Sequence, residues 1–145
     1  MIRKKIDIDN RAILSKMNKR DSVIIFGCGK YGKSIYRFLK RRKKEKKVLC
    51  FADNNKEKYE KKYKGIRIVS PEVAKKLNLE ALWIISSPQN SEKMIRQLQQ
   101  LHIDKSNILQ VTEEEMRFID QEIHKCWYDE DTYFMYENGF PLNWN

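Results

Sequence analysis

One stretch, Ser22 to Leu39, constrains the fold more than any other part of the chain. It reads SVIIFGCGKYGKSIYRFL, so an apolar run leads into three glycines and then directly into a helical pattern. Gly27, Gly29 and Gly32 have the GxGxxG spacing that opens a nucleotide-binding βαβ unit. There the first glycine permits a tight turn, the second lets a pyrophosphate approach the backbone, and the third lets the helix pack on the strand. The stretch therefore predicts an α/β fold and a nucleotide ligand.

Short apolar runs continue along the chain and alternate with helical patterns. The runs lie at residues 48–52, 66–69, 81–85 and 107–111, and the main helical patterns lie at 30–40, 71–77 and 91–101. The charged residues 56–64 are expected to form a helical turn or loop. Strands and helices that alternate at this spacing form parallel sheets with right-handed crossovers. We therefore expect a three-layer, Rossmann-like half, with a parallel sheet of about five strands in the order 3-2-1-4-5 and helices on both faces.

The length of 145 residues leaves room for one domain with a single core. We divide the chain into a leading helix at 1–21, a Rossmann-like nucleotide-binding domain at 22–111 and a C-terminal part at 112–145. The C-terminal part starts with a helical pattern and ends in an aromatic segment, and it holds nine acidic residues against two basic ones. We expect this acidic, aromatic tail to pack on the domain or on a partner.

An acid follows the second predicted strand. Asp53 lies 21 residues after Gly32, where a carboxylate can accept hydrogen bonds from ribose hydroxyls. An acid at this place repels a 2′-phosphate, so we expect NAD(H) rather than NADP as the cofactor, with Lys30, Tyr31 and Asn54 beside it. The alternative is that the sequence Asp-Asn-Asn at 53–55 only forms a turn after the strand.

Two serines follow the fourth predicted strand. Ser86 and Ser87 should border the crevice in which open α/β sheets bind ligands, because this strand neighbours the first in the expected order. We include both serines among the cofactor-binding residues. Helix capping by Ser87 or Asn90 is an equally good interpretation.

Patterns typical of catalysis have little support. Tyr36 and Lys40 show the TyrxxxLys spacing of short-chain reductases, but they fall on the first helix rather than after the fourth strand. We interpret that spacing as coincidence. Methyltransferases have an acid followed by a GxGxG loop, which would need an acid near Ile25 and a glycine in place of Tyr31. Neither is present, so a methyltransferase is the less favoured interpretation. No acid/base pair can be named, so the catalytic residues stay unknown.

The cysteines and histidines do not have the spacing of a metal site. Cys28, Cys50 and Cys126 are far apart in the sequence, and the only histidines are His102 and His124. We expect buried, reduced thiols and no metal.

The net charge of +10 makes nucleic acid a partner to consider. No nucleic-acid-binding module or regular alternation of basic and aromatic residues is visible, so a solvated basic surface is the preferred interpretation. No apolar stretch approaches the roughly 20 residues of a membrane span, and the basic N-terminus lacks the apolar core of a signal peptide. We expect a cytoplasmic protein without a transmembrane segment.

Four segments carry a resemblance to a known family, namely IIFGCGKYGKSIYRFLK, CFADNN, KGIRIVSPE and LWIISSP. Together they resemble small Rossmann domains of bacterial surface-polysaccharide proteins, similar to the N-terminal nucleotide-binding part of nucleoside-diphosphate-sugar epimerases and dehydratases. The resemblance covers residues 22–111 and implies a nucleotide site at Gly27, Gly29, Gly32 and Asp53. Complete epimerases of this type have a TyrxxxLys catalytic pair and a substrate region after the first half of the sheet, and the chain has neither at that place.

Three functions remain open. The first is a domain that binds NAD(H) or a sugar nucleotide for surface-glycan biosynthesis, as a homo-oligomer or with a partner glycan-biosynthesis enzyme. The second is an epimerase or dehydrogenase that completes its site across a dimer interface with tail residues such as Tyr128, Tyr133 or Tyr136. The third is a regulatory or scaffold protein whose aromatic tail is the working surface.

Overall fold

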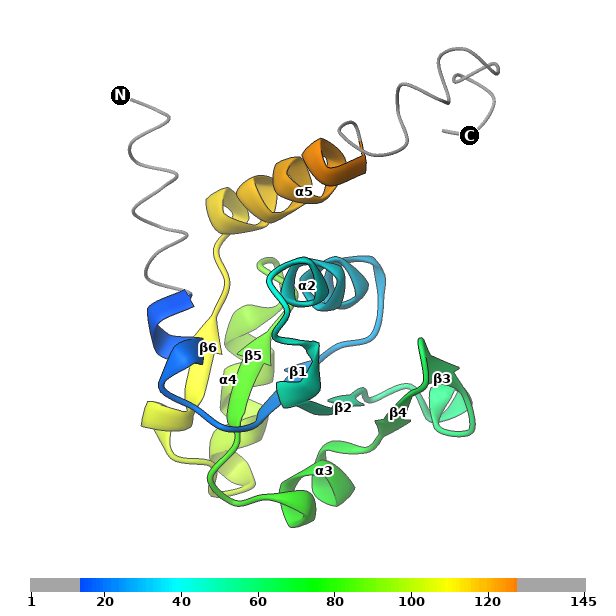
Figure 1. Cartoon of the computed structure of the whole chain (residues 1–145). Coiled ribbons are helices and arrows are strands. Elements are labelled where there is room, and N and C mark those ends of the chain that lie inside the picture. The colour runs from blue at the N-terminus through cyan, green and yellow to red at the C-terminus, as the bar shows by residue number, and fades with distance from the viewer. Residues whose placement is uncertain (1–13, 128–145) are drawn as a thin grey trace.

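The computed structural model describes residues 14–127 and shows an α/β fold built on one six-stranded sheet (Figure 1). The strand order is β3-β4-β2-β1-β5-β6. The strands are β1 Val23–Phe26, β2 Val48–Ala52, β3 Lys62–Tyr63, β4 Ile66–Val69, β5 Leu82–Ile85 and β6 Ile108–Gln110. Strand β1 lies at the centre and pairs in parallel with both β2 and β5. Because β1 and β5 are fully buried, both read as continuous apolar runs.

Helices cover both faces of the sheet, as expected. They are α2 Lys30–Arg41, α3 Pro71–Leu77, α4 Ser91–Gln100 and α5 Glu113–Trp127, with short 3₁₀ turns at Glu45–Lys47, Lys56–Lys58 and Lys105–Asn107. Residues 14–18 are also helical, but residues 19–21 are not, so the leading helix ends earlier than predicted, and residues 1–13 lie outside the described residues. Helix α3 begins where the sequence predicts, since Ser70 Oγ accepts a hydrogen bond from Val73 N at 3.2 Å and Pro71 opens the helix.

The buried side chains form two clusters, one on each face of the sheet. Alternate residues of β1 separate them, with Val23 and Ile25 on one face and Ile24 and Phe26 on the other. The first cluster joins the sheet to α2 and α5, and the second joins it to α3 and α4. Figure 1 shows α2 and α5 stacked on one side of the sheet and α3 on the other.

The sheet differs from the expected one in its count and at one edge. Residues 56–64 were expected to lack a strand, but Lys62–Tyr63 form β3, which pairs antiparallel with β4. Lys64 and Gly65 make the connection, with φ of 52° and 82°. Two consecutive residues with positive φ are typical of a two-residue hairpin turn. The sequence did not predict β3 because its surroundings are rich in lysine and a strand of two residues is too short to show apolar alternation.

The C-terminal helix packs on the domain rather than apart from it. Thr112 Oγ1 accepts a hydrogen bond from Glu115 N at 3.1 Å, and Glu115 Oε1 accepts one from Thr112 N at 2.9 Å, which forms a capping box. Met116 and Ile119 are buried in the cluster below α2. The predicted aromatic tail, from residue 128 onward, lies outside the described residues. Across residues 14–127, no helix combines the length and apolar character that a membrane crossing requires.

Candidate functional site

The glycine loop connects the central strand β1 to α2, and two of its three glycines are required by the fold itself. Gly27 has φ of 105°, and a Cβ placed there would lie 2.4 Å from Ser86 Oγ. A Cβ on Gly32 would lie 1.8 Å from the carbonyl oxygen of Gly27. The first glycine therefore permits the turn, and the third lets α2 pack against the loop, in the roles that the motif predicts.

Gly29 differs from the other two glycines. A Cβ on this residue would meet no protein atom within 4 Å. Gly29 is also the N-cap of α2 and provides no side-chain cap. Among the described residues, none accepts a hydrogen bond from the backbone N–H of Gly29, Lys30 or Tyr31. These N–H groups lie at the positive end of the helix dipole, and the space in front of them is open. An anion can therefore approach the backbone here.

Asp53 lies directly beside this loop. Its Oδ2 accepts a hydrogen bond from the backbone N–H of Cys28 at 2.8 Å, and its Oδ1 accepts one from Asn55 N at 2.8 Å. The bond from Asn55 N stabilises the turn that the alternative interpretation predicts. The bond from Cys28 N joins the end of β2 to the glycine loop. Each carboxylate oxygen has a second lone pair, so the two bonds leave acceptor capacity for a hydroxyl group.

Lys58 contacts both Cys28 and Asp53. Its Nζ donates to the carbonyl oxygen of Cys28 at 3.1 Å and lies 3.7 Å from Asp53 Oδ2. The ammonium group therefore offsets part of the negative charge of Asp53. Cys28 itself is buried, and this burial raises the pKa of its thiol, although Lys33 and Lys58 act in the opposite direction. A neutral, buried thiol is a packing group rather than a nucleophile.

A cleft of about 350 Å³ opens between the loop and α4. Its size is within the roughly 300–1,000 Å³ of ligand pockets. Asn54 and Gln97 face each other at the cleft and exchange two amide hydrogen bonds, of 2.9 Å and 2.8 Å. Its lining residues come from β1, the loops after β1 and β2, and α4 with its N-cap: Phe26, Gly27, Asp53, Asn54, Asn90, Lys93, Met94 and Gln97.

The two serines after β5 have different surroundings. Ser86 is buried, and its Oγ donates a hydrogen bond to the carbonyl oxygen of Phe26 at 2.7 Å, which joins the ends of β1 and β5. Ser87 is half-buried and does not line the cleft. Asn90, the other capping candidate, is the N-cap of α4, but its side chain makes no capping bond. The structure thus puts Gly27, Asp53 and Asn54 at the cleft, and neither serine in its lining.

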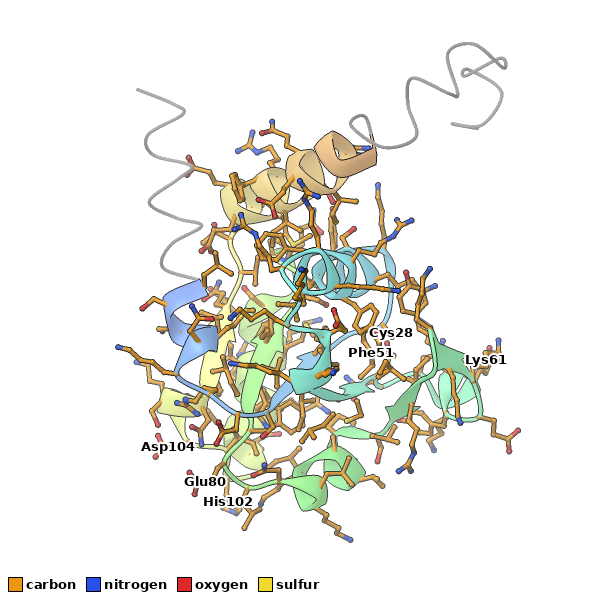
Figure 2. All side chains as sticks on the ribbon, viewed as in Figure 1. Cys28, Phe51, Lys61, Glu80, His102 and Asp104 are labelled. Carbon is orange, nitrogen blue, oxygen red and sulfur yellow. The ribbon has the colours of Figure 1, made fainter. Side chains whose placement is uncertain are left out.

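Tyr36, the cysteines and the histidines are the other residues that the sequence analysis considered. Tyr36 is buried against Phe51 and Tyr63, which raises the pKa of its phenol and gives it a packing role. Cys50 is a buried free thiol like Cys28, whereas the side chain of Cys126 is outside the described residues. The described residues contain no group of three potential metal ligands. His102 lies before β6, at the amino end of the strands and away from Cys28 (Figure 2).

Sequence reasoning missed Lys58, Lys93 and Gln97. The sequence did contain a signal for Lys93 and Gln97. Both are neighbours of Met94 on the helix predicted at 91–101, and this helix starts after the fourth strand, at the edge of the sheet that also carries the glycine loop. For Lys58 the lysine-rich run after Asp53 was visible, but nothing in it singled out one lysine.

Comparison with known proteins gives one family. The family model described as C2185-like, N-terminal, matches residues 17–109, which include the glycine loop, Asp53 and α4. The search of curated proteins found no match. Since the family model covers more than half of the chain, the protein belongs to the C2185-like N-terminal domain family.

Proposed function

We propose that this protein binds a nucleotide, NAD(H) or a sugar nucleotide, across its glycine loop. Gly29 is the observation that carries the proposal. The fold explains the other two glycines through contacts within the protein, but a side chain on Gly29 would meet nothing within 4 Å. A ligand that approaches the backbone would give the absence of a side chain there a purpose.

The surroundings of Gly29 support the same ligand. The free N–H groups at the start of α2 suit a pyrophosphate, and Asp53 beside them suits a ribose hydroxyl. The cleft next to Asp53 offers the methionine side chain of Met94 for contact with a base and amides from Asn54 and Gln97 for hydrogen bonds. The nucleotide would thus extend from the loop toward α4.

The role beyond binding follows from the resemblance to sugar-nucleotide enzymes. We propose that the protein serves surface-polysaccharide or sugar-nucleotide metabolism and is not a complete epimerase on its own. The buried position of Tyr36 supports the second point, because a phenol packed between Phe51 and Tyr63 cannot reach a substrate.

Isothermal titration calorimetry with NAD, NADH, a UDP-sugar and a CDP-activated compound tests the proposal. We expect binding of at least one of them and a loss of about tenfold or more in affinity on Gly29→Ala, because the added methyl group would occupy the space of the pyrophosphate. Ser34→Ala on the same helix, outside the cleft lining, is the matched control. Absence of binding to all four compounds would refute the proposal.

A further inference from the structure

A second pocket, of about 180 Å³, lies on the α2 side of the sheet. Three of its lining residues, Cys28, Tyr63 and Ile68, belong to the cluster that packs under α2, whereas the cleft at Asp53 includes Phe26 and Met94 from the opposite cluster. Figure 2 shows Cys28 below α2 and Lys61 beside β3. The other four lining residues are lysines: Lys33, Lys58, Lys61 and Lys62.

Two of these ammonium groups are held in place. Lys58 Nζ is fixed by the carbonyl oxygen of Cys28 at 3.1 Å. Lys33 Nζ lies 5.3 Å from the centre of the Tyr63 ring, a cation–π contact that keeps it against the pocket wall. Lys61 and Lys62 are exposed; Lys61 lies just before β3, and Lys62 is its first residue. Helix α2, the 3₁₀ turn and the hairpin at β3 therefore contribute four lysines to the lining of one small pocket.

This charge is not balanced within the pocket lining, which contains no acidic residue. The nearest described ion pair is between Lys58 and Asp53, and it neutralises only one of the four lysines. Like charges repel each other, by about 1 kcal/mol in water at a separation of about 4 Å, and lysines that line one pocket carry such a cost. A bound anion would turn this repulsion into attraction.

We infer that the lysine pocket binds a phosphate group. Lysine binds phosphate as a point charge, and several lysines around one tetrahedral anion need no planar geometry. The pocket is smaller than the roughly 300 Å³ at which ligand pockets begin, so it suits a single phosphate rather than a whole nucleotide. Binding of free phosphate does not depend on nucleotide binding in the cleft, whereas a phosphate carried by a nucleotide rests on the proposed function and would reach the lysines past Lys58, which lies between Asp53 and Cys28.

The phosphate has two possible sources, free phosphate or a phosphate carried by a nucleotide. The contact between Lys58 and Asp53 bears on the second source. The sequence predicts that Asp53 repels a phosphorylated ribose, but an ammonium group 3.7 Å from its Oδ2 weakens that repulsion. A phosphate on the ribose of a nucleotide is therefore compatible with Asp53 when the phosphate reaches the lysines.

The test compares the wild type with the double variant Lys61→Gln and Lys62→Gln, using calorimetry at low salt with inorganic phosphate, NADP and NAD. The double variant Lys40→Gln and Lys76→Gln removes the same charge from exposed positions outside the pocket and is the matched control. Unchanged thermal melting shows that the variants fold.

For free phosphate as the source, we expect binding by the wild type, a loss of about tenfold in the pocket variant and no change in the control. For a nucleotide as the source, we expect NADP to bind more tightly than NAD, and the pocket variant alone to remove the difference. Equal losses in both variants, or neither phosphate binding nor a preference for NADP, would overturn the inference. NAD binding that is lost only in Gly29→Ala would then leave the proposed function standing.

Discussion

The backbone N–H of Cys28 donates a hydrogen bond of 2.8 Å to the carboxylate of Asp53, which joins the glycine loop after β1 to the end of β2. These residues are 25 positions apart in the sequence. The bond shapes the loop before any ligand arrives, so Asp53 has a structural task that does not depend on the nucleotide. Both interpretations of Asp53, as a turn residue and as a ribose ligand, start from this geometry.

The bond between Cys28 and Asp53 predicts the stability of two aspartate variants. Asp53→Ala removes this bond and the turn bond to Asn55, and we expect it to lower the free energy of unfolding by about 2–3 kcal/mol, since it leaves a partly buried N–H without its charged partner. Asp104→Ala is the control, because the Asp104 carboxylate accepts the equivalent turn bond from Ser106 N, at 3.1 Å, and no second backbone N–H among the described residues. Urea unfolding measures both, and equal losses would contradict the importance of the loop contact.

The second and third glycines of the motif predict different effects of the same substitution. Gly32→Ala should lower the free energy of unfolding by about 3 kcal/mol or more, because its Cβ would lie 1.8 Å from the carbonyl oxygen of Gly27. Gly29→Ala should cost about 1 kcal/mol or less, the usual effect of alanine at an N-cap, and should act on nucleotide affinity instead. Thermal and urea unfolding separate the two, and a large loss of stability in Gly29→Ala would show that the fold requires this glycine as well.

The buried thiol of Cys50 predicts a pH dependence of stability. Burial raises the pKa of this thiol from 9.0 to about 11. The folded protein therefore keeps a proton that the unfolded chain loses, so stability from this group is present below pH 9 and is lost as the pH rises toward 11. The free energy of unfolding of the wild type should fall, relative to that of Cys50→Ala, by about 1 kcal/mol per pH unit in this range. Parallel pH profiles for the two proteins would contradict the shift.

The contact between α2 and α5 predicts a measurable coupling. Arg42 Nε donates to Glu122 Oε2 at 2.8 Å, and a second nitrogen of Arg42 donates to Oε1, so the pair is bidentate. The Arg42 side chain is 35% exposed, which limits the benefit to about 1 kcal/mol. A double-mutant cycle with Arg42→Gln and Glu122→Gln should show that coupling in urea unfolding, and it should weaken at high salt. Replacing the exposed neighbour Arg41 in the same cycle should show none.

Local patterns were enough to predict most of the elements. The buried runs of β1 and β5 and the Ser-Pro start of α3 agree with the structure, because each depends on a few neighbouring residues. Strand β3 was missed because it does not depend on neighbouring residues in the sequence. Its two residues have no pattern of their own, and only pairing with β4 across the turn at Lys64 and Gly65 makes them a strand.

The sequence by itself determined the α/β class, the glycine loop and the acid after β2, since spacing along the chain encodes them. Only the tertiary structure decided what surrounds them. In the folded protein, Ser86 donates a hydrogen bond to the backbone of Phe26, and Asn54 pairs with Gln97 beside the cleft. Lys33 and Lys58 line the same second pocket. These contacts join residues that are far apart in the sequence, and they depend on side-chain directions that form only when the sheet and its helices pack together.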